Sequence, residues 1–180
     1  MKIAIALIAA VAACTPAALA AREVAVSVDA RAQPWDVDAN KEMKFGKGDG
    51  AAPVVVPGFE DMAGANVAIF PLADGVTTVD GQQVGPEGVA GDVADDLRMK
   101  KKRVYPSLYT PKVLYPVYRH ALMAVFTDGE GRLVGRPFPV GSGVRVGVPD
   151  DAIALSLGFN DITFEDNSGA MTVVVEVPDE

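Results

Sequence analysis

The segments IALSL (153–157) and MTVVVEV (171–177) place an apolar side chain at every second position. Side chains two residues apart lie on the same face of a β-strand, so each segment has one continuous apolar face. The same alternation recurs upstream, whereas helical periodicity is hard to find after residue 20. The upstream runs are Val24, Val26 and Val28; Val67 and Ile69; and Leu122, Ala124 and Phe126. We therefore expect an all-β chain.

Turn-forming residues separate these apolar runs. They are Gly81, Gly85-Pro86, Asp128-Gly129 with Gly131, Gly141 with Gly143, and Ser168-Gly169. Many short strands broken by glycine and proline are typical of a β-sandwich or jelly roll and not of a parallel α/β sheet. The sequence has no linker clear enough to divide it, so it predicts one β-sandwich domain over residues 21–180. Irregular excursions are expected at about 33–58 and 97–120.

The first twenty residues have the pattern of an export signal. Lys2 precedes the apolar run Ile3–Ala13, and Ala18-Leu19-Ala20 offers small residues before a cleavage point at Ala21. No later segment approaches the roughly 20 apolar residues that a membrane-spanning helix needs. We expect residues 1–20 to be a signal peptide and the protein to be secreted or periplasmic. The alternative is a lipid anchor, because Val11-Ala12-Ala13-Cys14 resembles a lipobox.

Composition narrows the class of function. Cys14 is the only cysteine, so the exported chain can form no internal disulfide and needs a good core or a bound ion. The formal net charge is −8, which disfavours nucleic acid and anionic membranes as partners and leaves carboxylates available for cations. His120 is the only histidine, which excludes a multi-histidine metal site. No Gly-x-Ser-x-Gly motif is present, so we expect no enzyme and interpret His120 as a residue at the start of a strand.

The loop after residue 159 carries the most informative polar residues. Asp161, Asp166 and the amide of Asn167 lie close together in the sequence, with turn carbonyls such as that of Thr163 between them. Ca²⁺ prefers six to eight oxygen ligands from carboxylates, amides and backbone carbonyls. The alternative is that these Asp and Asn side chains only make turn hydrogen bonds to the backbone.

This loop and its flanks resemble the calcium loop of the bacterial galactose-binding PA-IL lectin family. The family pattern is a strand, Asn-Asp, a short loop, and then Asn-Asn-Ser-Gly before the last strand. Here the corresponding residues are Asn160-Asp161 and Asp166-Asn167-Ser168-Gly169, with a loop about two residues shorter. Further matches are Gly85-Pro86-Glu87-Gly88, Ala121-Leu122-Met123 through Gly135, Pro139 and Gly143, and Ala152–Leu155. The resemblance implies a galactose-binding-domain-like jelly roll.

The resemblance also implies a ligand set for calcium. Asp161, Asp166 and Asn167 would supply side chains, Thr163 a carbonyl, and the earlier loop a carbonyl near Val79, with Thr78 as the alternative. In this family two sugar hydroxyls complete the coordination, so Asp161 and Asn167 would also lie at the sugar. The family's sugar-gripping His and Gln have no counterparts in the stretch Val89–Asp95. Asp92 and Asp95 are the acceptors available there, and selectivity for galactose is not expected.

The sequence thus predicts a calcium-dependent saccharide-binding protein. The alternative is a calcium-stabilised structural or interaction domain of the cell envelope without a sugar site, and homo-oligomerisation is left open. Two features have two interpretations. The basic, tyrosine-rich stretch from Arg98 to His120 either contacts glycans or is a solvated projecting hairpin, and Trp35 is expected in the core or a lid rather than as a sugar platform.

Overall fold

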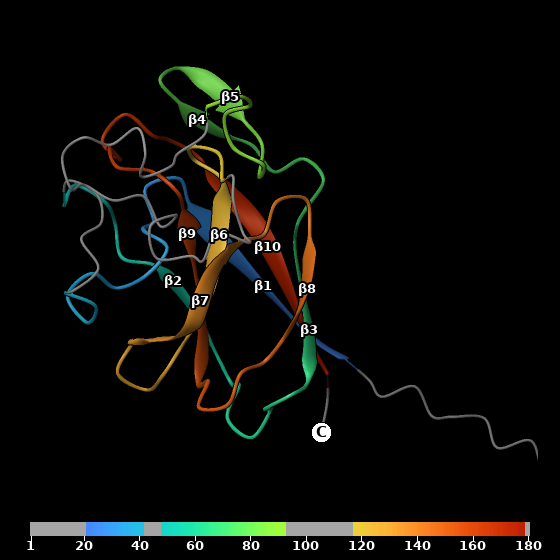
Figure 1. The fold of residues 1–180 in the computed structure, drawn as a ribbon. Helices are drawn as coiled ribbons and strands as arrows, with labels where there is room; N and C mark the ends of the chain where they lie inside the picture. The colour runs from blue at the N-terminus through green and yellow to red at the C-terminus, as the bar shows by residue number, and fades with distance from the viewer. Residues whose placement is uncertain (1–20, 42–47, 93–116, 179–180) are drawn as a thin grey trace, which may run out of the picture.

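The computed structural model describes residues 21–41, 48–92 and 117–178 (Figure 1). The strands are β1 (Ala21–Asp29), β2 (Val54–Pro57), β3 (Asn66–Pro71), β4 (Thr77–Val79), β5 (Gln82–Val84), β6 (Leu122–Thr127), β7 (Leu133–Pro139), β8 (Val144–Gly147), β9 (Ala154–Phe159) and β10 (Ala170–Pro178). No helix occurs among these residues. The expectation of an all-β chain is confirmed.

The strands form two four-stranded antiparallel sheets and one small hairpin. The sheet orders are β1-β10-β3-β8 and β2-β9-β6-β7, and β4 pairs with β5 alone. With that hairpin set aside, the first strand pairs with the last and the second with the next to last, as in a jelly roll. Figure 1 shows the β4–β5 hairpin at one end of the sandwich and the β6–β7 connection at the other. The predicted jelly-roll sandwich is therefore the observed fold.

The core lies between the two sheets because the alternating strands turn their apolar faces inward. In β10, Met171, Val173, Val175 and Val177 are at most 2% exposed. Burying a side chain of this size stabilises the fold by about 1.5–3 kcal/mol. The same cluster contains Val28, Trp35, Val67, Ile69, Leu122, Phe126, Leu155, Leu157 and Phe159. Trp35 is fully buried, so it belongs to the core.

Strands β6 and β9 are buried on both faces, which simple alternation does not predict. For β9, the reason is that the chain after β1 covers the outer face of the strand. Phe159 donates its backbone N–H to the carbonyl of Ala32, and the backbone of Gln33 and Pro34 lies directly against Gly158. The absence of a side chain at Gly158 allows this close approach.

The excursion expected at 33–58 is in part regular structure. Its last residues form β2, which pairs with β9, and a bridge joins Ala32 to Ala51. Of the second excursion, only 117–120 is described, and the expected signal segment 1–20 with Cys14 also lies outside the described residues. The described part of the chain contains no helix long and apolar enough to cross a membrane.

Candidate functional site

Three segments meet at the end of the sandwich that carries the β4–β5 hairpin. The loop 160–169 follows β9 directly, and its Ser168 exchanges two backbone hydrogen bonds with Thr78 of the hairpin, at 2.8 and 2.9 Å. The hairpin turns at Asp80-Gly81, where both residues have positive φ, 49° and 75°, as a two-residue type I′ turn requires. The third segment is the turn that leads into β6 and contains Arg119 and His120.

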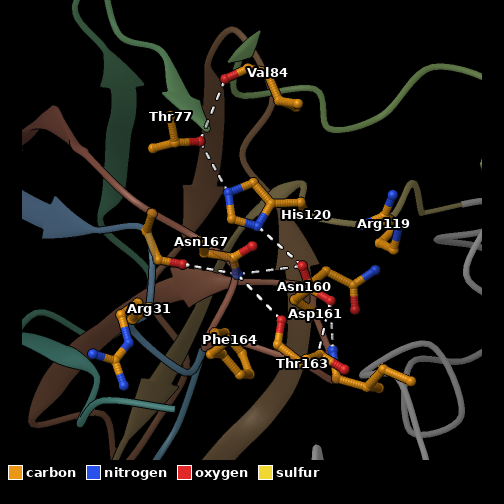
Figure 2. Close-up of polar contacts among 12 residues, drawn as sticks. Arg31, Thr77, Val84, Arg119, His120, Asn160, Asp161, Thr163, Phe164 and Asn167 are labelled. Atoms are coloured by element: carbon orange, nitrogen blue, oxygen red, sulfur yellow. Dashed lines mark hydrogen bonds and ion pairs between the residues drawn. The ribbon is translucent and has the colours of Figure 1, made fainter. Parts of the chain in front are cut away.

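Asp161 lies at the centre of this site and is only 2% exposed. Its Oδ1 atom accepts the backbone N–H groups of Ile162 at 2.8 Å and Thr163 at 3.4 Å. Its Oδ2 atom lies 3.3 Å from Nδ1 of His120 and 3.4 Å from Nδ2 of Asn167 (Figure 2). The carboxylate is therefore oriented by both the backbone of its own loop and two side chains.

His120 is fully buried and connects Asp161 to the β4–β5 hairpin. A carboxylate only accepts hydrogen bonds, so Nδ1 of the imidazole carries the proton that faces Asp161. The other nitrogen, Nε2, lies 2.9 Å from the hydroxyl of Thr77, as Figure 2 shows. The ring also stacks on Phe159, with centroids 4.4 Å apart and an interplanar angle of 7°.

The backbone of His120 is unusual for a non-glycine residue. Its φ of 59° lies in the left-handed region, which is sparsely populated by side-chain-bearing residues. A backbone hydrogen bond of 2.6 Å to the carbonyl of Asn160 and the buried ring contacts hold it there. His120 lies just before β6, as expected, but its side chain belongs to the site and is not merely a strand-start residue.

Thr77, His120 and Asp161 have the hydroxyl–imidazole–carboxylate order of a hydrolytic triad. Their exposed fractions are 1%, 0% and 2%, so the Thr77 hydroxyl lies inside the protein and a substrate does not reach it in this structure. That hydroxyl also lies 3.4 Å from the carbonyl of Val84. The three residues act here as a structural connection between loop and hairpin.

Asn167 is 4% exposed and gathers three oxygen atoms around one point. Its Nδ2 lies 3.3 Å from the carbonyl of Ala30 and 3.4 Å from both Asp161 Oδ2 and the carbonyl of Thr163. These distances exceed the usual 2.7–3.2 Å for N–H···O bonds. Its Oδ1 atom is buried and has no partner among the described residues. Rotating the amide by half a turn would place Oδ1 beside the other oxygens, which is a donor set for a hard cation.

Two further carboxylates meet at the exposed rim of the site. Asp166 hydrogen-bonds Asp80 at the hairpin tip, and burial, followed by this contact, raises the pKa of Asp166. The same hydrogen bond, followed by the charge of Arg119, lowers the pKa of Asp80. Two carboxyl groups in such contact share either a proton or a cation, because two bare negative charges at this separation repel each other.

Arg119 joins the hairpin tip to the loop that follows Gly88. Its Nε lies 2.8 Å from Asp92 Oδ2, and its Nη2 lies 3.1 Å from Asp80 Oδ2. Burial lowers the pKa of Arg119, but the Asp92 hydrogen bond and the charges of Asp161 and Asp80 outweigh this effect and raise it. The Arg119 backbone N–H donates to the carbonyl of Asp92, and the Arg119 carbonyl accepts the N–H of Val89, both at 2.8 Å. These bonds fix the backbone from which the guanidinium extends.

The structure brings together three of the residues that the sequence proposed for a metal, Asp161, Thr163 and Asn167. Asp166 lies at the rim and contacts Asp80. Of the two candidate carbonyls in the hairpin, that of Thr78 already accepts the N–H of Ser168, and Val79 is the next residue, paired with Gln82. Of the two acceptors proposed for a sugar, Asp92 is paired with Arg119, and Asp95 lies outside the described residues.

Sequence reasoning did not find Thr77, Asp80, Arg119 or the role of His120. Their contacts join residues far apart in the sequence, such as Thr77 and His120 at 43 positions, and no local pattern marks such pairs. In the described segments, no three His, Cys, Asp or Glu side chains are grouped so that they could hold a metal by themselves. A cation here would therefore depend on amide and backbone oxygens as well.

No family model matches the chain, and the comparison with curated proteins found no match. Among solved structures, the chain is similar to one described as "EclA N-terminal domain; PllA-like lectin", with a TM-score of 0.43 and 18% sequence identity. The alignment covers 86% of this chain and 95% of that chain.

Proposed function

We propose that the protein is a non-catalytic, lectin-like module that binds a saccharide through a calcium ion at the loop 160–168. The observation that carries the proposal is the convergence of Asp161, the Thr163 carbonyl and the Asn167 amide on one buried point. Nδ2 of Asn167 faces this point, and its Oδ1 atom, on the other side of the amide, is buried without a partner among the described residues. A buried polar atom without a partner costs about 1–3 kcal/mol, and a cation at this point, with the amide rotated by half a turn, would remove that cost.

The donor set fits calcium better than zinc. Carboxylate, amide and carbonyl oxygens are the ligands that Ca²⁺ prefers, whereas structural zinc sites use Cys and His. The single histidine, His120, already contacts Thr77 and Asp161. When bound, Ca²⁺ supplies coordination positions that two neighbouring sugar hydroxyls can fill. The chain contributes the oriented Asp161 carboxylate, the loop fixed to the hairpin at Thr78 and Ser168, and the rim carboxylates.

A second candidate is a calcium-stabilised structural or interaction domain without a sugar site. The burial of Asp161 and Asn167 favours it, because an ion among these atoms would have little contact with solvent. The two candidates share the metal but differ in whether a saccharide reaches it. Their experiments are therefore separate.

The metal is tested by thermal unfolding with saturating calcium and with chelator. A ligand that binds only the folded state stabilises it by about 2.7 kcal/mol at a hundredfold excess over Kd. Asp161→Asn should abolish this rise in Tm, and Asp166→Asn, at an exposed position that tolerates the change, should weaken it. Asp36→Asn is the control, since Asp36 holds the backbone of a loop outside this site. An equal Tm with calcium and with chelator contradicts the proposal.

Saccharide binding is tested by calorimetric titration of galactose, mannose and fucose. We expect binding to the calcium-loaded protein and none after chelation, without restriction to galactose. Binding that survives chelation would refute the role of the metal. A calcium-dependent Tm with no saccharide binding would support the structural-domain alternative.

A further inference from the structure

The Arg119 side chain is held by two other segments of the chain, beside the proposed metal site. Ion pairs fix Nε to Asp92 and Nη2 to Asp80, which lie on different segments from Arg119 and from each other. The side chain is 21% exposed, so it is ordered but still accessible. Within residues 21–41, 48–92 and 117–178, no ion pair or hydrogen bond of its side chain uses Nη1.

This arrangement places fixed donors and acceptors side by side. A guanidinium has five N–H donors in one plane, and only some of them are used by the two carboxylates. A pair of neighbouring sugar hydroxyls both donates and accepts hydrogen bonds, so it matches a guanidinium that lies beside a carboxylate. Because the ion pairs already restrict Arg119, little further side-chain entropy is lost when a ligand binds.

The charge of the surroundings selects against acidic ligands. Four carboxylates interact with one another or with Arg119 through hydrogen bonds and charge: Asp80, Asp92, Asp161 and Asp166. Among the described residues, Arg119 is the cation in this group. Even with a divalent cation added, four carboxylates exceed the positive charge by one unit. A ligand with its own carboxylate would meet net repulsion from these groups.

We propose that Arg119, together with Asp92, orients a neutral saccharide at this site. Arg119 and Asp92 would contact and orient the sugar, a role for which the stretch 89–95 offers no His or Gln. This inference rests on the proposed saccharide-binding function, and it adds the residue that fixes orientation and the class of sugar. Arg119 acts on the sugar and not on the metal, so the two roles separate experimentally.

The test compares Arg119→Met with Arg132→Met in the full chain. Arg132 is a matched control, because it also pairs with two carboxylates, Asp128 and Glu130, but lies in the β6–β7 connection at the opposite end of the sandwich. Galactose, mannose, fucose and glucuronate are titrated against the calcium-loaded proteins. We expect Arg119→Met to bind the best neutral sugar about tenfold more weakly or worse, with the calcium-dependent rise in Tm retained. Arg132→Met should bind as the unmodified protein does.

Asp92→Asn provides a second variant that changes charge and not shape. It should also weaken the neutral sugar, and it should reduce the discrimination against glucuronate. If Arg119→Met and Asp92→Asn bind the neutral sugar with unchanged affinity, or if glucuronate binds the unmodified protein most tightly, this inference is wrong while the proposed function stands. If the unmodified, calcium-loaded protein binds none of the four sugars, the proposed function and this inference both fail.

Discussion

The imidazole of His120 and the carboxylate of Asp161 form a buried pair, with 3.3 Å between Nδ1 and Oδ2. Forty-one positions separate the two residues in the sequence, and the pair joins the turn before β6 to the loop after β9. On its other side, His120 contacts Thr77 at 2.9 Å, so the hairpin is connected as well. The geometry of the loop therefore depends in part on His120, which lies outside it.

His120→Leu should destabilise the fold by about 2–6 kcal/mol. The variant keeps an apolar contact to Phe159 but leaves Asp161 Oδ2 and the Thr77 hydroxyl buried with a lost partner, and each such loss costs about 1–3 kcal/mol. Thr77→Val, which removes the hydroxyl from both His120 Nε2 and the Val84 carbonyl but leaves Asp161 with its histidine partner, should cost less, about 1–3 kcal/mol. Urea unfolding at neutral pH measures both values. The losses of unfolding free energy in the single variants His120→Leu and Asp161→Leu should sum to more than the loss in the double variant. Strict additivity would contradict the coupling between the two residues.

The sequence predicted the strands well because their signal is local. The alternation in β1 and β10 is visible within nine residues, and both strands turn the expected side chains inward. The sequence did not predict that β9 is buried on its outer face as well. The segment around Gln33 that covers this face lies more than a hundred residues earlier in the sequence. The alternation of apolar residues indicates which face of a strand is apolar. It does not indicate whether another segment packs on the opposite face.

For the site, residue type and spacing predicted part of one loop. Asp161, Thr163 and Asn167 are within six residues of each other, so one turn of backbone brings them together. The partners Arg119 and His120 come from another segment, and the pairing of Asp166 with Asp80 depends on the β4–β5 hairpin. Such contacts follow from the topology of the jelly roll and are not encoded in spacing.

Gly158→Ala should be among the most destabilising small changes in the chain. A Cβ atom at this position in β9 would overlap the backbone of Gln33 and Pro34, which has no flexible end that can move aside. Overpacking of a tight interior costs about 1–3 kcal/mol, and more where backbone must shift. Gly147→Ala in β8 is the matched control, since a Cβ there has no atom within 4 Å, and it should change stability by no more than about 0.5 kcal/mol. Equal unfolding midpoints for the two variants would disprove the packing argument.

The stability of the β6–β7 connection should decrease at acidic pH because of Asp128. The hydrogen bond from Arg132 lowers the pKa of Asp128 most, and backbone N–H groups of Arg132 and Glu130 add to this effect. A carboxyl group with a lowered folded-state pKa contributes stability above its unfolded value near 3.9, and that contribution is lost as pH falls through the folded value. Asp128→Asn should therefore flatten the decline of Tm below about pH 4.

Export should leave a chain that begins at Ala21. The described strand β1 pairs with β10 from Ala21 opposite Pro178 to Asp29 opposite Ala170, so cleavage after Ala20 keeps these pairings. Intact-mass measurement of the exported protein checks the start. A mass that includes Cys14 with a diacylglycerol group would establish the lipid-anchored alternative instead.

Asp49 should hold the loop 160–168 in shape from outside it. Its Oδ2 atom accepts the consecutive backbone N–H groups of Phe164 at 2.9 Å and Glu165 at 3.2 Å, across more than a hundred residues of sequence. Hydrogen bonds to a charged acceptor are stronger than those to a neutral one, so Asp49→Ala should weaken the protection of this loop by at least about 1.4 kcal/mol. Amide hydrogen exchange at Phe164 and Glu165 should then become about tenfold faster or more.

The control for this change is Asp36→Ala. Asp36 accepts two consecutive backbone N–H groups in the same way, from Asp38 at 2.8 Å and Ala39 at 3.2 Å, but in another loop. Its replacement should speed exchange at Asp38 and Ala39 and leave Phe164 and Glu165 unchanged. Because the loop supplies Asp161, Thr163 and Asn167, a loosened loop should also bind calcium more weakly in Asp49→Ala and not in Asp36→Ala. Unchanged exchange at Phe164 and Glu165 in Asp49→Ala would show that the loop keeps its conformation without this carboxylate.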